Sequence, residues 1–557
     1  MAVQGIQALP ADLFHLLAQQ LSDNADFPTL YSCLVSSKQM ANAGAVSALY
    51  RSSHERAAKL GGSEGLSLPE QELNVQKWSI LWRSIILSAL GKTLYPYCRH
   101  LRMLDLRDLG YLLEDDKFRG KISKHFFEGD LARFRIVMNT PGKGRVVERL
   151  DRNKIVLAVG DEITQQAPLL DAISEPSGLT TLSGALLTWV PRLGNLRRLE
   201  LFDGNALADE TVRNLLHAHC PNLDSLAIFR SSGSEADHNL ATFIGGMPEN
   251  RLVYFESVGD CGIATETCLA LNSHGKSLQE LKLALSEQGI LALGLLQQCT
   301  AVTKLSIGAE RTGIDLKATQ NDVYLEVVEW LKNCVNLKNV SFHNMPSAPD
   351  LMTPILQNKT VALEELDING RIDADYIVKD HQDFHRALRQ QPSLRHLGLR
   401  ADPDTVTRDD NDLLMNTLCS LTGLSELKLT RISDYFSDEH ISVIGRTLSN
   451  LEDLYIGGYG ISDAVLHEIA KLKKLKALTF SGVTNFTSAG LVAFIDQLGQ
   501  GNHGLVLSVD MADPDTAITE EEQNTVRERI YGKLQGRFEY QLLRDPNMPE
   551  FDSDDSD

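Results

Sequence analysis

The chain has 557 residues, of which 43% are hydrophobic and 23% are charged. This composition is typical of a globular protein and excludes a collagenous or wholly disordered chain. The net charge of −20 argues against nucleic acid as a partner, because like charges repel. No apolar run is long enough for a membrane span and no secretory signal opens the sequence, so no membrane association is expected. With eight dispersed cysteines, the sequence indicates a soluble protein with reduced thiols in the cytoplasm and/or nucleus.

The first 51 residues predict three short helices, over 9–21, 29–40 and 41–50. Pro10 suits the first helical position, where a missing N–H costs nothing, and Asp12 in the first turn favours the helix dipole. A module of this size is too small to hold a core alone, so it must dock on its own repeats or on a partner. One apolar stripe runs along the first helix and consists of Leu9, Leu13, Leu16 or Leu17, and Leu21.

Residues 52–75 are rich in Gly, Ser and Glu and read as a linker, and 76–97 predict a buried helix. An isolated copy of the pattern L-x-x-L-x-L, where L is any apolar residue, begins at Leu101. The pattern then lapses, and we interpret 107–195 as an irregular insertion. A basic cluster within 143–154 favours a solvated loop before a helix at 155–170, with a basic binding loop as the alternative.

The same pattern then recurs in phase eleven times, at a mean interval of about 28 residues. One in-phase match is common by chance, whereas eleven indicate a leucine-rich repeat. The copy at Leu252 is degraded, with Ser257 at its third apolar position. The first anchors are Leu196, Leu223, Leu252, Leu278, Val302, Leu337, Leu363, Leu394, Leu424, Leu451 and Leu475.

The alternating part of each repeat predicts a short strand with one buried face, and the remainder predicts a helix. Because one strand and one helix cannot bury their own apolar faces, neighbouring repeats must stack. The expected fold class is therefore α/β, a leucine-rich-repeat solenoid with a horseshoe of parallel strands and outer helices. We expect the solenoid with its helical N-terminal cap over 76–510, a cap helix and strand over 511–544, and an acidic disordered tail over 545–557.

Four cysteines share one phase of the repeat, three residues before a first anchor: Cys98, Cys220, Cys299 and Cys334. A repeated phase separates these side chains by stacking steps and lacks the C-x-x-C pairing of a zinc site. We therefore interpret them as small buried residues at the corner between helix and strand, typical of cysteine-containing leucine-rich repeats.

The N-terminal module resembles an F-box. The family pattern begins with a leucine-proline pair and an acidic residue, continues with a leucine stripe and a valine-serine-basic stretch, and ends in leucine-tyrosine-arginine. The usual aromatic residue after the basic position is absent here, where Gln39 or Met40 stands. The residues that match, and that the resemblance implies for adaptor binding, are Leu9, Pro10, Asp12, Leu13, Leu17, Leu21, Val35, Lys38 and Leu49.

An F-box followed by leucine-rich repeats is similar to the substrate receptors of SCF ubiquitin ligases. The resemblance implies that the module binds a Skp-type adaptor, and through it a cullin, and that the repeats bind an unknown protein substrate. The whole chain looks like F-box proteins with ribonuclease-inhibitor-like repeats from filamentous fungi. The segments that carry this likeness are 81–87, 93–98, 107–109, 432–436 and 537–540.

The alternative is a leucine-rich-repeat scaffold in a complex outside ubiquitination, such as repair, transport or chromatin, with the N-terminal helices as a plain cap. An F-box should stand off the solenoid and leave Leu9, Leu13 and Leu17 partly exposed. A cap should bury them against 76–106.

Strand residues that alternate with the anchors should point into the concave face, where a protein partner is expected to bind. No motif for catalysis, nucleotide or metal binding is convincing, so we expect no enzyme, cofactor or metal. His381 and His385 lie one helical turn apart but have no third ligand in the sequence. The concave-face candidates are Glu200, Phe202, Arg230, His343, Arg400, Lys428 and Tyr455.

Overall fold

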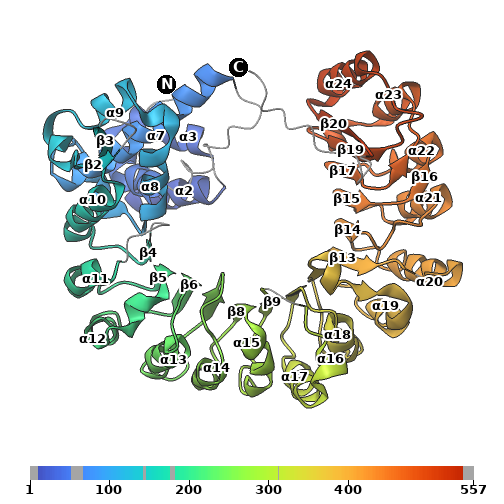
Figure 1. Cartoon of the computed structure of the whole chain (residues 1–557). Helices are drawn as coiled ribbons and strands as arrows, with labels where there is room; N and C mark the ends of the chain where they lie inside the picture. The colour runs from blue at the N-terminus through green and yellow to red at the C-terminus, as the bar shows by residue number, and fades with distance from the viewer. Residues whose placement is uncertain are drawn as a thin grey trace. The chain divides into compact units, whose positions relative to one another are not determined.

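The computed structural model describes residues 10–24, 26–51, 67–141, 146–175, 182–310, 313–404 and 406–543. The chain forms two compact units, unit 1 (Met1–Gly262) and unit 2 (Ile263–Asp557), whose elements Figure 1 labels. The repeat pattern runs through Gly262, so the sequence did not indicate this division. Leu9, Lys143, Arg145, most of the expected linker and the expected tail 545–557 lie outside the described residues.

The N-terminal module folds around a small apolar core. Ala18, Leu30 and Ala45 are buried at its centre. The predicted second helix breaks at Ser37, whose extended backbone lets its hydroxyl accept a hydrogen bond from the Met40 N–H at 3.1 Å. The elements are α2 (Ala11–Asp23), α3 (Phe27–Ser36), α4 (Lys38–Met40), one π-helical turn η1 (Ala41–Ala45) and α5 (Val46–Tyr50).

Gly44 lets η1 approach α2 closely. Its φ is 157°, and a Cβ there would lie 3.0 Å from the Cα of His15. A larger residue would push the two helices apart, because backbone atoms cannot rotate out of the way.

Unit 1 continues as a parallel sheet of repeat strands. The strands, in spatial order, are β1 (Met103–Asp105), β4 (Ala172–Ser174), β5 (Arg198–Asp203), β6 (Ser225–Arg230) and β7 (Tyr254–Ser257). Ile173 of β4 lies in register with Leu104 on one side and Leu199 on the other. The segment 107–195 therefore contains a repeat strand, and the copy at Leu101 is not isolated.

Glu175 explains why the sequence pattern missed β4. It occupies the third anchor position, which is apolar in most other repeats, and it is buried. Its carboxylate accepts hydrogen bonds from the backbone N–H groups of Phe202 at 2.8 Å and Asp203 at 3.1 Å, and from that of Leu182. Burial raises the pKa of Glu175 to about 7. A polar anchor is tolerated here because three N–H groups solvate it.

Helices connect the strands of unit 1. The helix expected over 76–97 begins earlier, at Leu68, because Ser67 and Glu70 form a capping box in which the Ser67 N–H donates to Glu70 at 3.0 Å. The helices are α7 (Leu68–Ala89), α8 (Leu106–Glu114), α9 (Lys121–Phe126), α10 (Arg152–Gln166), α11 (Ser183–Trp189), α12 (Glu210–His219) and α13 (Ala236–Gly245), with 3₁₀ turns η2 (Tyr97–His100), η3 (Asp116–Phe118), η4 (Gly129–Phe134), η5 (Val190–Arg192) and η6 (Gly204–Ala208).

An antiparallel hairpin stands apart from the repeat sheet of unit 1. It consists of β2 (Val137–Pro141) and β3 (Val146–Leu150). Of the basic cluster expected as a loop, Arg149 therefore lies on β3, and Arg152 and Lys154 lie at the start of α10.

Unit 2 repeats the strand and helix scheme, with the strands on one side and the helices on the other (Figure 1). Anchors of neighbouring strands lie side by side. Leu427 of β14, for example, is in register with Leu397 of β13 and with Leu454 of β15. The strands are β8 (Glu280–Leu285), β9 (Lys304–Ala309), β10 (Asn339–His343), β11 (Glu365–Asn369), β12 (Tyr376–Ile377), β13 (His396–Asp402), β14 (Glu426–Thr430), β15 (Asp453–Ile456), β16 (Tyr459–Ile461), β17 (Ala477–Phe480), β18 (Val483–Thr484), β19 (Val506–Ala512) and β20 (Arg537–Leu542).

The sequence pattern also missed β19. Leu507 and Val509 lie in register with the anchors Leu478 and Phe480, but Gly504 stands at the first anchor position. The expected helix and strand at the C-terminal end are present as α24 and β20. The helices of unit 2 are α14 (Thr265–Leu271), α15 (Glu287–Leu291), α16 (Leu316–Thr319), α17 (Asn321–Asn333), α18 (Ala348–Leu356), α19 (Gln382–Leu388), α20 (Arg408–Leu418), α21 (Asp438–Thr447), α22 (Leu466–Ile469), α23 (Ser488–Gln497) and α24 (Glu520–Leu534), with 3₁₀ turns η7 (Asn272–His274), η8 (Leu293–Leu295), η9 (Ile372–Ala374), η10 (Val378–His381), η11 (Asp463–Val465) and η12 (Gln500–Asn502).

These elements confirm the predicted α/β fold built from leucine-rich repeats. The four cysteines that share a repeat phase are buried; Cys220 and Cys334 directly follow α12 and α17, Cys98 lies within η2, and Cys299 lies between η8 and β9. The Cys220 thiol donates to the Leu193 carbonyl at 3.6 Å and the Cys334 thiol to the Cys299 carbonyl at 3.5 Å, each in the preceding repeat. Within the described ranges, no helix is both long and apolar enough to cross a membrane.

Asp108 joins α7 and α8. Its Oδ2 accepts hydrogen bonds from the indole N–H of Trp78 at 2.8 Å and of Trp82 at 2.6 Å, while the buried Oδ1 has no partner. Burial raises the pKa of Asp108 to about 7. The stability contributed by this group is therefore fully present below the ordinary pKa of 3.8 and is lost as the pH rises to about 7, because over that range the unfolded chain releases a proton that the folded chain retains.

Replacing Asp108 by Asn should abolish this pH dependence, since Asn keeps an oxygen for both indoles and cannot ionise. We expect the stability of D108N relative to wild type to rise between about pH 5 and pH 8 by on the order of 2–4 kcal/mol. Thermal midpoints of both proteins at the two pH values measure the effect. An equal difference at both pH values would show that Asp108 ionises without cost.

Candidate functional site

The N-terminal module contacts the repeats of unit 1 through its last helix. The Tyr50 ring stacks on Tyr97 with centroids 4.3 Å apart and planes at 16°, and the Tyr50 hydroxyl lies 3.5 Å from the Ser84 Oγ. The Arg102 N–H donates to the Arg51 carbonyl at 3.2 Å. Burial raises the pKa of Tyr50, so the hydroxyl stays protonated. The module is therefore tethered at α5.

The first two helices leave large apolar side chains in solvent. Leu13 is 47% exposed and Leu17 is 45% exposed, one turn apart on α2. Tyr31 and Val35, one turn apart on α3, are exposed as well. Exposed leucine pairs of this kind are costly unless a partner covers them, so α2 and α3 form candidate docking surfaces.

The residues expected to bind the adaptor divide into two sets. Leu21 and Leu49 are partly buried and pack on the core of the module, so they serve its folding. Leu9 lies outside the described residues. Leu16, which the sequence placed in the apolar stripe, is exposed as well, and so is Tyr31, which the sequence pattern did not single out. The expected residues that lie on the surface are Pro10, Asp12, Leu13, Leu17, Val35 and Lys38.

The strand face of unit 1 carries a charged network. The Arg107 guanidinium donates to Glu200 Oε2 at 2.7 Å and to Asp105 Oδ1 at 3.1 Å. The Ser174 hydroxyl donates to the same Glu200 oxygen at 2.6 Å. Asp105, Ser174 and Glu200 occupy one row of the sheet across β1, β4 and β5. Glu200 is thus held in place by two donors, Ser174 on the neighbouring strand β4 and Arg107 at the start of α8.

Two phenylalanine rings and two arginines stack beside this network. The rings of Phe202 and Phe229 lie 6.1 Å apart at 27°. The Arg230 guanidinium lies 4.8 Å from the Phe202 ring centre, and that of Arg107 lies 5.4 Å from the Phe229 ring centre. We call these four residues the Arg–Phe stack. Sequence reasoning missed Phe229 and Arg107, although aligning the anchors Leu201 and Ile228 would have paired Phe229 with Phe202.

The strand face of unit 2 brings Lys428 and Tyr455 together. They are register partners on β14 and β15. The Lys428 ammonium lies 2.5 Å from Glu426 Oε1 and 3.3 Å from Asp453 Oδ2. Gly398 faces Lys428 from β13, and the Asp367 carboxylate fills the space where its Cβ would be. The row from Asp367 to Tyr455 is therefore a continuous polar surface.

Arg400 and His343 are each engaged locally. Arg400 Nε donates to Asp375 Oδ1 at 2.8 Å, and Arg431 contacts the other oxygen of Asp375 at 3.4 Å. His343 Nε2 lies 3.0 Å from the Ser341 hydroxyl. Arg400 lies on β13, which pairs with β14, the strand of Lys428. His343 lies on β10, and β11 separates that strand from β13.

The histidine pair of α19 and its preceding turn is part of the packing. His381 lies 3.2 Å from Asp350 Oδ2, and the buried His385 lies 3.2 Å from the Tyr376 hydroxyl. Burial lowers the pKa of His385 to about 3. Within the residues that the structure describes, no cluster of three His, Cys, Asp or Glu side chains could hold a metal.

The in-register strands and repeated anchors define a leucine-rich-repeat protein. No family model matches the sequence, and no curated protein matches it. Solved structures that it resembles include an internalin from Listeria monocytogenes, at 14% identity, TM-score 0.37, and coverage of 65% of this chain and 94% of that one. Yeast Rad7, solved with Elc1, has 14% identity, TM-score 0.31 and coverage of 82% and 96%.

A third structure, TLR13 in complex with ssRNA13, has 11% identity, TM-score 0.29, and coverage of 76% of this chain and 59% of that one. At these scores the likenesses carry no argument about function. The repeat assignment depends on the strand register itself.

Replacing Tyr50 by Ala should loosen the module, because the Tyr97 ring loses its partner. We expect a loss of about 1–3 kcal/mol in local stability. Amide hydrogen exchange in α2 and α3 should accelerate, while exchange in the repeat strands should not. The Y50F variant keeps the stack and should exchange like wild type. Unchanged exchange in Y50A would show that the module is held elsewhere.

Proposed function

We propose that this chain is a non-catalytic substrate receptor of an SCF-type ubiquitin ligase. The observation that carries the proposal is the exposure of Leu13 and Leu17 in a module that is tethered through α5. A plain cap would bury these side chains against the repeats. The F-box resemblance assigns the same residues to a Skp-type adaptor, which links to a cullin.

The adaptor would cover the exposed apolar faces of α2 and α3. Burying the exposed half of two leucine side chains contributes about 2 kcal/mol, so these residues are a substantial part of a docking surface. Asp12 and Lys38 are exposed nearby in sequence and are suited to polar contacts at its rim. The chain would perform no chemistry itself, since ubiquitin transfer takes place on the partner enzymes.

A protein substrate would bind the strand faces. The Arg–Phe stack presents aromatic and arginine side chains, the residue types that contribute most at protein interfaces. Its rings are held by neighbours from adjacent strands, so little side-chain freedom is lost on binding. Lys428 and Tyr455 offer a second, polar surface in unit 2. The domain boundaries, and a location in the cytoplasm and/or nucleus, belong to the same proposal.

The L13A/L17A variant tests the adaptor surface. Because both side chains are exposed, the module should stay folded while binding of a purified Skp-type adaptor weakens at least about tenfold. Isothermal titration calorimetry with the full-length chain measures the affinity. The matched control is L269A/L325A, which removes two leucines of unit 2 that are 52% and 54% exposed.

Equal binding by the L13A/L17A variant and wild type would contradict the proposed surface. No binding by wild type would favour the alternative, a scaffold in a complex outside ubiquitination. Circular dichroism and a thermal scan of each variant show whether its fold is retained.

A photoreactive p-benzoyl-phenylalanine at position 202 tests the substrate face. We expect it to crosslink proteins that carry ubiquitin in cells with the wild-type module and that lack ubiquitin in the L13A/L17A background. The same amino acid at position 187, on the outer helix α11, is the control. Capture of the same proteins from position 187, or ubiquitin attachment that is independent of Leu13 and Leu17, would contradict the assignment.

A further inference from the structure

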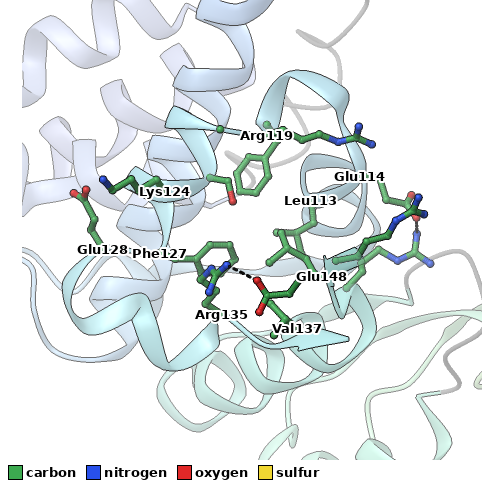
Figure 2. A pocket seen from close by; sticks show the side chains of 15 residues that line it. Leu113, Glu114, Arg119, Lys124, Phe127, Glu128, Arg135, Val137 and Glu148 are labelled. Carbon is green, nitrogen blue, oxygen red and sulfur yellow. Dashed lines mark hydrogen bonds and ion pairs between the residues drawn. The ribbon is translucent and has the colours of Figure 1, made fainter. Parts of the chain in front are cut away.

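A cleft of about 900 Å³ lies between the hairpin β2–β3 and the segment from α8 to α9 in unit 1. Figure 2 shows Lys124 and Glu128 at one end, Glu114 at the other, and Leu113 and Phe127 between them. Its volume falls within the roughly 300–1,000 Å³ of clefts that hold ligands in proteins. None of the surfaces described above includes this cleft.

The floor of the cleft is apolar. Leu113, Phe118 and Phe127 line it and are themselves buried, so their packing fixes its shape. Val137 of β2 and Leu150 of β3 complete the lining from the hairpin. A ligand side chain that enters the cleft therefore meets hydrocarbon, which favours an apolar group.

The rim carries more positive than negative charge. Three carboxylates and five cations line it. The rim therefore has a positive net charge, although the net charge of the chain is −20. The acids are Glu114, Glu128 and Glu148, and the cations are Arg119, Lys124, Arg135, Arg149 and Arg152.

Two of these cations are available to a ligand. Arg135 pairs with Glu148 at 3.5 Å, Arg152 pairs with Glu114, and Arg119 pairs with Asp116 outside the lining at 2.8 Å. Within the part of the chain that the structure describes, Lys124 and Arg149 form no side-chain hydrogen bond or ion pair. They come from different elements, α9 and β3, so carboxylates of one ligand can bind to both.

We propose that this cleft binds an acidic segment of a partner protein, with a bulky apolar side chain on the floor and flanking carboxylates on Lys124 and Arg149. This assignment rests on the cleft alone and does not depend on the module or on ubiquitination. The mixed rim favours a peptide over nucleic acid: separate carboxylates of a peptide can lie on Lys124 and Arg149, whereas a dense row of phosphates would also meet Glu114, Glu128 and Glu148.

The test uses the full-length chain and a fluorescein-labelled peptide, Glu-Asp-Glu-Phe-Asp-Glu-Asp, followed by fluorescence anisotropy. We expect saturable binding that weakens with added salt, because the ion pairs are at the surface. Reversing the two available cations in K124E/R149E should weaken binding at least about tenfold. A peptide with Ala in place of Phe should bind several-fold more weakly, because the floor loses its contact.

The matched control is K359E/R389E, which changes net charge equally at two exposed cations of unit 2 and should leave the affinity within about twofold of wild type. Equal binding by K124E/R149E and wild type would overturn the proposal, as would no binding to wild type. Tighter binding of a single-stranded oligonucleotide of equal charge would also overturn it and identify a polyanion groove. Thermal midpoints verify that each variant is folded.

Discussion

The burial of one face of every repeat strand is the constraint on which the rest of the structure depends. A strand such as β14 buries Leu427 and Leu429 against the helices and leaves Lys428 on the opposite face. Because parallel strands stay in register, the exposed residues of successive repeats form straight rows. A binding face thus follows from the core: once the anchors are buried, the position of each alternating residue is fixed. Lys428 and Tyr455 are neighbours for this reason, although 27 positions separate them in the sequence.

The N-terminal module, in contrast to the repeats, leaves large apolar side chains exposed. Its core is centred on Ala18, Leu30 and Ala45, side chains that are mostly small, and so it buries only part of the apolar surface that its short helices carry. Leu13 and Leu17 are left outside because the positions facing the core on α2 are already filled by Phe14 and Ala18. Apolar surface that a small domain cannot bury remains available for a partner.

The sequence predicted much of the repeat fold because the apolar pattern of one repeat is short and recurs eleven times, so each copy supports the others. It failed where a single residue broke the pattern: Glu175 replaced an anchor in β4, and Gly504 replaced one in β19. Candidate binding residues such as Phe202 were found because they alternate with the buried anchors along a strand. Arg107 was missed because its contact with Glu200 joins residues 93 positions apart. The cleft had no sequence signature, since its walls come from 113–137 and 148–152 and meet only after folding.

The cations of these surfaces differ in whether they are already paired with a carboxylate of the same protein. Arg107, Arg400 and Lys428 lie at the strand faces, and each is paired with a carboxylate, that of Glu200, Asp375 and Glu426 respectively. Such pairs orient side chains for a partner but offer little net charge, so specificity there depends on shape and aromatic contact. Lys124 and Arg149 differ because, among the residues that the structure describes, neither forms an ion pair. An acidic ligand would gain most in the cleft, where it neutralises charge without first breaking an existing pair.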